Sequence, residues 1–402
     1  MKILVVGGGG REHAIIKKLK ENPAVETIYA LPGNGGIAQD ATCVAIGAKD
    51  IPAIVEFAKA NTVDFAVVAP DDPLVLGCVD ELSKLGIPCF GPNAAAAQIE
   101  GSKVFSKNLM KKYNIPTVIK ADGLALGKGV IIAQTREEAE AAVRSMMEDR
   151  VFGESGSRVV IEEFLTGPEV SVLAFTDGET LKPMVSSMDH KRAGDNDTGL
   201  NTGGMGTIAP NPFYTKELAE ECMETIFLPT IRAMKAEGRP FSGCLYFGLM
   251  ITPDGPKVIE YNCRFGDPET QVVLPLLKTD LLTVMQAVAE KRLHEIDLQF
   301  SEGAACCVIL ASKGYPQAYE SGCPIRLPEP SEDTMIVVAG AKQTEEGLVS
   351  AGGRVLGVCA TAPTLKQAIS RAYAECEKVD FKNGFCRSDI GARALRQGEL
   401  NS

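Results

Sequence analysis

Short apolar runs alternate with helix-like stretches in the N-terminal part of the chain, and this pattern limits the possible folds more than any other feature. The apolar runs are residues 3–6, 28–31, 65–69 and 88–91. Helical patterns separate them, most clearly at residues 51–61 and 73–85. Strands that alternate with helices form parallel sheets whose faces the helices cover. We therefore expect an α/β domain with a parallel sheet at the N-terminus.

A run of four glycines, Gly7 to Gly10, follows the first apolar run and opens a helical stretch. A dinucleotide-binding fingerprint needs a third glycine where this chain has Glu12, and an acidic residue where residues 30–32 read Ala-Leu-Pro. We therefore reject a dinucleotide fold. The run is either a tight strand-to-helix turn or an anion site at a helix N-terminus. The same two readings apply to residues 32–36.

A glycine-rich stretch with two lysines joins two strand-like runs at residues 118–133. It is not a Walker loop, because the pattern GxxxxGK[ST] is absent. A glycine loop between two strands can close over phosphates as a lid, with Lys120 neutralising their charge. The alternative is a β-hairpin with a mobile tip, and we favour the lid.

The stretch KVIEYNCRFGDPE, residues 257–269, groups several chemically useful side chains. It follows an apolar run and an Asp-Gly turn, a pattern typical of a β-hairpin. Alternation in the second strand predicts that Val258, Glu260 and Asn262 share one face. A carboxylate and an amide oxygen that point the same way can ligate Mg²⁺ on nucleotide phosphates. The alternative is a half-exposed strand with a polar outer face.

The loop at residues 194–206 is glycine-rich and too long to be a mere connection, so we expect it to be functional. The lone His190 before it is expected to be structural, and we give it no role. From about residue 301 onward, short β-rich runs and one capped helix starting at Thr364 predict a separate small β-rich domain.

Charge and cysteine usage exclude some classes of protein. The net charge is −11, which argues against a protein that binds duplex nucleic acid. The 12 cysteines form no CxxC pair, and their scattered positions fit the reducing environment of the cytoplasm. Cys306 and Cys307 lie in an apolar run, so we expect them to be core thiols. No apolar segment approaches the length of a membrane span, so we expect no membrane partner.

Taken together, these motifs resemble the ATP-grasp superfamily and, more narrowly, the glycinamide ribonucleotide synthetase family. The likeness runs from end to end of the chain, and the long-loop motif is specific to the family. The matching stretches are GGGGREHA, PGNGG, FGPNAAAAQIEGSK, VIKADGLALGKGV, IEEFLTGPEVS, DHKRAGDNDTGLNTGGMGT and IEYNCRFGDPETQ, with GGRVLGV and FCRSDIG further on.

The chain departs from the family pattern at one place. In the family, a further strand and helix lie between the segment that ends here at Thr117 and the strand that begins here at Val118. A segment of about twenty residues is therefore missing, roughly the length of one strand and one helix. The shortening leaves the motif residues in place but changes the hinge of the lid.

The resemblance implies an α/β and α+β multidomain architecture. It implies an N-terminal parallel α/β substrate-binding domain at residues 1–100 and an ATP-grasp domain at residues 101–300, with a lid subdomain at about 118–175. A C-terminal β-rich domain would cover residues 301–402.

The resemblance also implies the reaction, the second step of de novo purine biosynthesis. Glycine and 5-phosphoribosylamine are the small-molecule substrates, and ATP is split to ADP and phosphate through a glycyl phosphate. The implied metal is Mg²⁺ or Mn²⁺. We expect a monomer or weak homodimer.

The family's functional residues map onto matching positions. The implied metal ligands are Glu260 and Asn262. The implied catalytic residues are Arg264, Lys120, Asp189 and Lys191. Residues that would bind ATP are Lys103, Lys120, Gly127, Lys128, Gly129, Glu162, Glu163, Phe164, Leu165 and Glu169. Residues that would bind the other substrates are Gly10, Arg11, Glu12, Asn34, Asp197, Thr198, Asn201, Thr202, Gly203, Gly204, Asp267 and Glu269.

Three other readings stay open at this point. The first is another ATP-grasp carboxylate–amine ligase or carboxylase with a different acid. The second is a nicotinamide oxidoreductase, which Glu12 disfavours. The third is a nucleotide-binding module without enzymatic activity.

Overall fold

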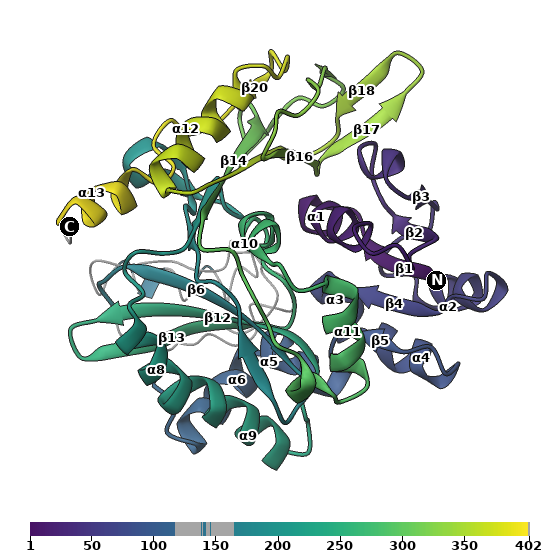
Figure 1. Cartoon of the computed structure of the whole chain (residues 1–402), viewed down its shortest axis with the longest axis vertical. Helices are drawn as coiled ribbons and strands as arrows, with labels where there is room; N and C mark the ends of the chain where they lie inside the picture. Colours follow the sequence, from purple (N-terminus) through teal and green to yellow (C-terminus); the bar gives the residue numbers. More distant parts are fainter. Residues whose placement is uncertain (117–137, 139, 142–144, 146–164, 401–402) are drawn as a thin grey trace.

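The computed structural model of the 402-residue chain describes residues 1–116, 138, 140–141, 145 and 165–400. Figure 1 shows a purple N-terminal group of elements around β1 and a teal group around β6, β12 and β13. A yellow-green C-terminal group lies around β14 and α12. Within the described ranges, no helix combines the length and the apolar character that crossing a membrane requires.

Five parallel strands form the N-terminal sheet in the order β3-β2-β1-β4-β5. The strands are β1 (Lys2–Gly7), β2 (Thr27–Pro32), β3 (Thr42–Cys43), β4 (Phe65–Val68) and β5 (Cys89–Phe90). The accompanying helices are α1 (Gly10–Leu19), the 3₁₀ turn η1 (Ile37–Gln39), α2 (Ile51–Ala60), α3 (Asp71–Val75) and α4 (Cys78–Lys84). The expected parallel sheet is confirmed. Its strand order is that of doubly wound sheets, so the chain differs from a dinucleotide domain in its residues and not in its topology.

One capping residue, Ser102, divides the helical segment that follows this sheet. The predicted helical stretch after residue 93 consists of two helices, α5 (Ala94–Gly101) and α6 (Lys103–Lys112). Ser102 has an extended backbone, and its hydroxyl accepts a hydrogen bond from the backbone N–H of Phe105. This cap ends α5 and starts α6. Lys103, a predicted phosphate ligand, is therefore the first residue of α6.

The middle group is built on an antiparallel sheet in the order β13-β12-β6-β7. Its strands are β6 (Glu169–Thr176), β7 (Leu181–Pro183), β12 (Gly243–Thr252) and β13 (Gly255–Asn262). A helical segment consists of α8 (Lys216–Cys222), a π-helical turn (Met223–Phe227) and α9 (Leu228–Ala236). The predicted hairpin is confirmed, because Thr252 of β12 pairs with Gly255 of β13.

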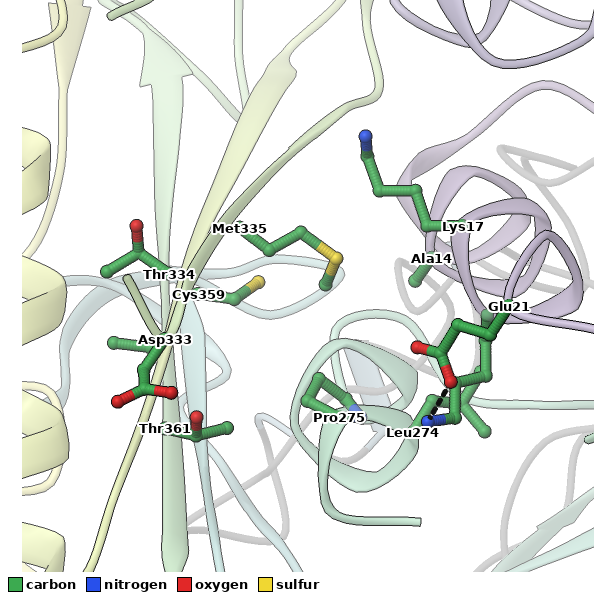
Figure 2. Close-up of a pocket in the computed structure, with 12 residues that line it drawn as sticks. Ala14, Lys17, Glu21, Leu274, Pro275, Asp333, Thr334, Met335, Cys359 and Thr361 are labelled. Carbon is green, nitrogen blue, oxygen red and sulfur yellow. Dashed lines mark ion pairs between the residues drawn. The ribbon is translucent and has the colours of Figure 1, made fainter. Parts of the chain in front are cut away.

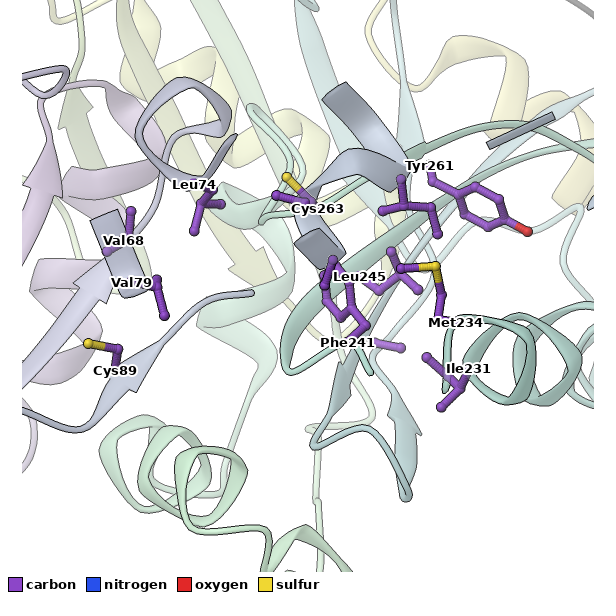
Figure 3. Close-up of a cluster of buried hydrophobic side chains, with 14 of the residues drawn as sticks. Val68, Leu74, Val79, Cys89, Ile231, Met234, Phe241, Leu245, Tyr261 and Cys263 are labelled. Carbon is purple, nitrogen blue, oxygen red and sulfur yellow. The ribbon is translucent and has the colours of Figure 1, made fainter. Parts of the chain in front are cut away.

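One hydrophobic core joins this sheet to the N-terminal domain. Figure 3 shows Val68 and Cys89 of the N-terminal strands in the same cluster as Leu245, Tyr261 and Met234. All five side chains are less than 10% exposed. Burying apolar surface across this boundary fixes the two domains against each other.

The C-terminal group is β-rich, as expected, but its main sheet recruits strands from earlier in the chain. That sheet has the order β16-β19-β14-β11-β8, with β20 beside β14. Its strands are β8 (Met188–Asp189), β11 (Gly206–Ala209), β14 (Ala304–Ser312), β16 (Thr334–Val338), β19 (Arg354–Ala362) and β20 (Gly384–Phe385). Because β8 and β11 flank the long glycine-rich loop, both ends of that loop are anchored in the C-terminal sheet.

The remaining elements complete the C-terminal and connecting parts. They are β9 (Arg192–Gly194), the 3₁₀ turn η3 (Asp195–Asp197), β10 (Thr198–Asn201), α10 (Thr270–Leu276), α11 (Leu281–Ala289), η5 (Leu293–Glu295), β15 (Pro324–Ile325), β17 (Ala341–Thr344), β18 (Gly347–Ser350), α12 (Leu365–Cys376) and α13 (Ala392–Leu400). Thr364 caps α12 as predicted, since its hydroxyl accepts from the N–H of Gln367. Strands β9 and β10 pair as a small two-stranded ribbon within the glycine-rich loop.

Candidate active site

The face of the β12–β13 hairpin opposite the shared core carries the two predicted metal ligands. Glu260 lies opposite Gly248, and Asn262 lies opposite Tyr246. A Cβ atom at Gly248 would come within 3.2 Å of the side chain of Glu260, so the glycine gives that side chain room. Both predicted ligands are partly exposed, whereas their neighbour Tyr261 is buried in the core.

The prediction that Val258 shares this face is wrong. The register of the two strands shifts between Gly248 and Leu249, which leaves Ile259 as an extra residue. Such a β-bulge interrupts the regular alternation of side chains. Val258 is fully buried in the same cluster as Tyr261, on the core side of the sheet. Glu260 and Asn262 follow the bulge, and their common orientation is kept.

A buried carboxylate that the sequence analysis did not single out holds the end of this strand. Glu100, at the end of α5, accepts hydrogen bonds from Nδ2 of Asn262 at 2.9 Å and Nη2 of Arg264 at 3.0 Å. It also accepts from the backbone N–H of Cys263 at 2.7 Å. Burial raises the pKa of Glu100, and the charge of Arg264 opposes this shift. Because Nδ2 of Asn262 is turned to Glu100, Oδ1 is the amide atom directed elsewhere.

Lys191 connects the strand face with β6. Its Nζ lies 3.0 Å from Oε2 of Glu169 and 4.0 Å from Oε1 of Glu260. The two carboxylates raise the pKa of Lys191, with Glu169 as the larger cause, so the lysine is a cation at neutral pH. Glu169, a predicted ATP ligand, Lys191, a predicted catalytic residue, and Glu260, a predicted metal ligand, therefore occupy one small region.

The glycine-rich loop closes onto this region at Gly204. This residue has φ +113°, and a Cβ atom there would lie 2.5 Å from both Oδ1 of Asp189 and Cδ of Pro268. Only glycine fits such a close approach. Thr202 is held as well, because its N–H and its hydroxyl both donate to the carbonyl of Lys191. The structure thus brings residues 202–204 together with Asp189 and Lys191.

Two predicted residues, the half-buried Asp189 and the buried Glu269, form an acidic pair beside the loop. Burial, and then the nearby charge of Glu269, raise the pKa of Asp189. Burial also raises the pKa of Glu269. The cations of Lys191 and Arg354 lower the pKa of Asp189 and partly offset these effects. A site with two carboxyls of raised pKa and adjacent cations can bind polar, charged substrates.

Arg354, from β19 of the C-terminal sheet, was not predicted. Its Nη1 donates to the carbonyls of Gly203 at 2.7 Å, Gly204 at 3.3 Å and Asp267 at 2.8 Å. Its Nη2 lies 3.6 Å from Oδ2 of Asp267. Arg354 therefore ties the loop to the turn after β13. Arg354 and Glu100 both fall in motifs that carry the family resemblance, but no local pattern around either residue indicates its role.

The N-terminal glycine loops reach the same turn through Arg11. Its Nη1 donates to the carbonyl of Phe265 at 3.1 Å, and its Nε bonds Oε1 of Glu12 at 2.7 Å. The other oxygen of Glu12 accepts from the N–H of Gly9 at 2.6 Å. Gly10 is the first residue of α1. Both oxygens of Glu12 are therefore engaged inside the protein, and its predicted contact with substrate would need a rearrangement.

Asn34 is also used structurally. Its Nδ2 donates to the carbonyls of Gly8 and Val338, and its Oδ1 accepts from two backbone N–H groups of its own loop. The side chain thus joins the two N-terminal glycine loops to the C-terminal sheet. His190 is similarly held, with Nδ1 bonded to the carbonyl of Gly206 and Nε2 accepting from the N–H of Gly391.

The outer part of the glycine-rich loop is not in the central cluster. Thr198 and Asn201 are exposed, and Asp197 pairs with Arg387 at 2.9 Å. Several predicted ATP ligands lie outside the described residues, namely Lys120, Gly127, Lys128, Gly129, Glu162, Glu163 and Phe164. Leu165 is described as a half-buried residue before β6.

The donors present fit a hard divalent cation. In the described part of the chain, no three His, Cys, Asp or Glu side chains cluster closely enough to hold a metal. The candidate ligands are instead the carboxylate of Glu260 and the amide oxygen of Asn262. Oxygen ligands from one or two side chains, completed by phosphate oxygens and water, are typical of Mg²⁺ in nucleotide sites.

A separate cavity lies between α1, α10 and strands β16 and β19. Figure 2 shows Lys17 of α1 and Glu21 just after this helix on one side, with Met335 and Cys359 of the sheet on the other. The residues that line it include none of the predicted site residues. This cavity is therefore distinct from the candidate active site.

Family models match three parts of the chain. The phosphoribosylglycinamide synthetase N domain matches residues 1–100, the ATP-grasp (A) domain of the same family matches residues 116–270, and its C domain matches residues 305–393.

Curated relatives agree over nearly the whole length. Proteins named phosphoribosylamine–glycine ligase from Agrobacterium fabrum and Escherichia coli O157:H7 are 46% and 47% identical to the chain. The alignments cover 98% and 99% of this chain, and 99% of each relative. The alignment with the E. coli protein extends over 426 residues although this chain has 402, so that relative has residues without a counterpart here.

Solved structures show the same architecture. The phosphoribosylamine–glycine ligase of Thermotoga maritima is 34% identical, with a TM-score of 0.83, and the match covers 97% of this chain and 100% of the other. The biotin carboxylase domain of the Hydrogenobacter thermophilus 2-oxoglutarate carboxylase, solved with MgADP and bicarbonate, has a TM-score of 0.72 at 16% identity. That match covers 96% of this chain and 91% of the other, and it shows a shared fold only.

Proposed function

The chain belongs to the phosphoribosylglycinamide synthetase family, and we propose that it joins glycine to 5-phosphoribosylamine to give glycinamide ribonucleotide, with ATP split to ADP and phosphate. The observation that carries the proposal is the meeting of the Glu260–Asn262 strand face with Lys191, Asp189 and the loop at residues 202–204. Family membership makes the chain an ATP-dependent ligase of purine biosynthesis.

The proposed reaction has two steps. The carboxylate of glycine attacks the γ-phosphorus of ATP, ADP leaves, and glycyl phosphate forms. The amine of phosphoribosylamine then attacks the acyl carbon, and inorganic phosphate leaves. Phosphorylation is needed because a free carboxylate has no adequate leaving group. The site must also exclude water, which would hydrolyse the acyl phosphate.

The described residues supply fixed charges for these steps. Glu260 and Asn262 would hold Mg²⁺, with Mn²⁺ as an alternative, and the bound cation neutralises phosphate charge during transfer. Arg264 is oriented by Glu100 and stabilises charge that develops on the transferred group. Lys191 is held near both Glu169 and Glu260, so it orients the substrates without losing its charge.

Other predicted details are part of the same proposal. Lys103 and Lys120, with the loop at residues 127–129, would bind the phosphates of ATP, and Glu169 its ribose. The missing segment would lie between Thr117 and Val118, beside the lid, and the longer alignments with relatives support a shortened chain. We propose that the enzyme acts in the cytoplasm on small molecules, without nucleic acid or membrane, as a monomer or weak homodimer.

The decisive experiment measures ADP and phosphate release with glycine and freshly made phosphoribosylamine, each omitted in turn. We expect ADP in proportion to glycinamide ribonucleotide and little release when either substrate is left out. Release of AMP and pyrophosphate would contradict the acyl phosphate. If other amino acids or bicarbonate replaced glycine equally well, the chain would instead be an ATP-grasp ligase or carboxylase for a different acid.

A further inference from the structure

The outer part of the glycine-rich loop is held by a buried arginine from the C-terminal part of the chain. Arg387 is 2% exposed, yet its guanidinium makes four hydrogen bonds. Nη1 donates to the carbonyl of Arg192 at 3.0 Å and to Oδ1 of Asp197 at 2.9 Å. Arg192 is the first residue of β9, which leads into the loop, and Asp197 lies in the η3 turn, so one nitrogen of Arg387 bridges β9 and this turn.

Asp389 fixes the orientation of the forked guanidinium group of Arg387. Nε and Nη2 of Arg387 donate to the two oxygens of Asp389 at 2.8 and 2.9 Å. A bidentate pair between guanidinium and carboxylate holds the planar group in one orientation. Since Nε and Nη2 are both taken by Asp389, Nη1 points at the loop. The arrangement depends on the fork shape of arginine, which lysine lacks.

Further bonds from the same segment hold the turn of the loop. The N–H of Ser388 donates to Oδ1 of Asp195 at 2.8 Å, and its hydroxyl donates to the other oxygen of Asp195. In return, Oδ2 of Asp389 accepts from the N–H of Asn196 at 2.8 Å. Each residue of the η3 turn is therefore bonded to residues 387–389.

The turn needs such support because its backbone conformation is unfavourable. Asn196 and Asp197 have φ of 55° and 54°, in the left-handed region that residues other than glycine rarely adopt. The following strand, residues 198–201, is exposed along its whole length, so burial of apolar surface does not hold it. Besides local bonds such as that from the hydroxyl of Thr198 to the carbonyl of Asp195, the contacts with residues 387–389 favour this conformation.

We propose that Arg387 is a positioning residue for the acceptor side of the site. It holds the outer loop so that residues 202–204, which follow directly, stay closed on Asp189 and Lys191. Arg387 is too deeply buried to touch a substrate. The inference rests on the proposed function for its substrates, glycine and phosphoribosylamine. The residues proposed to bind ATP lie outside the loop, so we expect the binding of ATP to be independent of this clamp, by which we mean the contacts of residues 387–389 with the loop.

The test compares Arg387→Met with Arg387→Lys and the milder Ser388→Ala. With Arg387→Met, KM for glycine or phosphoribosylamine rises about tenfold, as expected for loss of one or two hydrogen bonds, while KM for ATP changes less than about twofold. Arg387→Lys keeps the charge but lacks the fork, so the same KM rises by a smaller factor than in Arg387→Met. Ser388→Ala, at an exposed residue that should not disturb folding, shifts the same KM in the same direction by a few-fold. Arg393→Met, at an exposed arginine on α13, serves as a control for removal of an arginine from the same part of the chain.

A second measurement tests whether the clamp holds the loop, independently of the proposed reaction. Trypsin can cleave after Arg192 when the loop opens, so Arg387→Met speeds cleavage there about tenfold and leaves cleavage after the exposed Lys278 unchanged. If wild-type ATP turnover ignored glycine, the proposed function would fail while this measurement still reported on the clamp. Unchanged KM values for both acceptors in folded Arg387→Met and Ser388→Ala, or cleavage at the wild-type rate, would overturn the inference.

Discussion

The strand face that carries Glu260 and Asn262 and the loop that carries residues 202–204 meet in one site, but they are held by different means. The strand is fixed by the ladder between β12 and β13, with Glu100 holding its end. The loop is fixed by side chains from the C-terminal sheet and the segment after it, Arg354 and Arg387. A site can therefore combine a rigid part built into a sheet with a part whose conformation depends on a distant domain.

This difference predicts that substitutions in the two regions affect different steps of the reaction. Changes on the strand face should affect the chemistry and the binding of the metal, because that face has the predicted metal ligands. Changes at the contacts of the loop should weaken the binding of the acceptor substrates, glycine and phosphoribosylamine, and leave the binding of ATP unchanged. The predictions below, from the largest expected effect to the smallest, test this separation.

Glu260→Gln should have the largest effect. The substitution keeps the shape of the side chain but removes the charge that would hold the cation and that faces Lys191. We expect kcat to fall on the order of 100-fold or more, because even residues that only support a metal ligand change activity by about 10–100-fold. Steady-state kinetics across a Mg²⁺ titration would show the loss together with a higher ion requirement.

The matched control for that variant is Glu220→Gln on α8, an exposed carboxylate whose side chain is 68% accessible. It should leave both kcat and the Mg²⁺ requirement unchanged. If Glu260→Gln behaved like this control, the strand face would not bind the metal, and the proposed division between strand and loop would be lost.

Glu100→Gln should have the next largest effect, and it reaches the site indirectly. The variant leaves the buried guanidinium of Arg264 without its carboxylate partner and weakens the hold on Asn262. We expect the free energy of unfolding to fall by about 2–4 kcal/mol, since breaking a buried ion pair is costly. The Mg²⁺ requirement should rise about tenfold, as for loss of a group that orients a ligand.

Urea unfolding and a Mg²⁺ titration would measure these two effects. Glu81→Gln, at a more exposed carboxylate that pairs with Lys84 on the helix surface, is a suitable control and should change stability by less than about 0.5 kcal/mol. Wild-type stability and an unchanged titration in Glu100→Gln would show that Asn262 keeps its orientation without Glu100.

Arg354→Met tests the loop side of the comparison. The substitution removes three hydrogen bonds to the carbonyls of Gly203, Gly204 and Asp267 but keeps a long side chain of similar bulk. We expect KM for one or both acceptor substrates to rise about tenfold, with KM for ATP changed by less than about twofold. An equal rise in the KM for ATP would mean that loop and strand are not separable, which initial-rate kinetics with each substrate varied would reveal.

The sequence predicted the strand side better than the loop side, and the reason is physical. A hairpin with an Asp-Gly turn is a local pattern, so the common orientation of Glu260 and Asn262 could be derived from alternation. The bulge at Ile259 could not, because it depends on register with β12, and it moved Val258 to the core. The N-terminal sheet and the β-rich C-terminal part could likewise be predicted from local periodicity.

The partners of the loop could not be derived in this way. Arg354 follows Gly204 by 150 positions, and Arg387 follows Asp197 by 190. Nothing in a local pattern indicates that two arginines so far along the chain turn back onto one loop. For the same reason the pairing of Asp197 with Arg387 was not predicted.

The smallest expected effect concerns stability and its dependence on pH at Asp389, on the loop side. Burial alone would raise the pKa of this carboxyl, but the hydrogen bonds from Arg387 and from the N–H of Asn196 lower it to about 2. A carboxyl whose folded pKa is depressed contributes stability above its unfolded pKa of about 3.9 and loses it as the pH falls toward the folded value. Asp389→Asn should therefore lower the free energy of unfolding by about 1–2 kcal/mol at pH 7, and the difference from wild type should be about half as large near pH 3. Urea titrations at pH 7, 4 and 3 would measure this difference in the free energy of unfolding. The control is Asp333→Asn, whose exposed pair with Arg371 should contribute less than about 0.5 kcal/mol to stability. A difference between Asp389→Asn and wild type that stayed constant down to pH 3 would mean that Asp389 acts through its shape and its neutral hydrogen bonds, and that the charge of Arg387 does not stabilise the clamp.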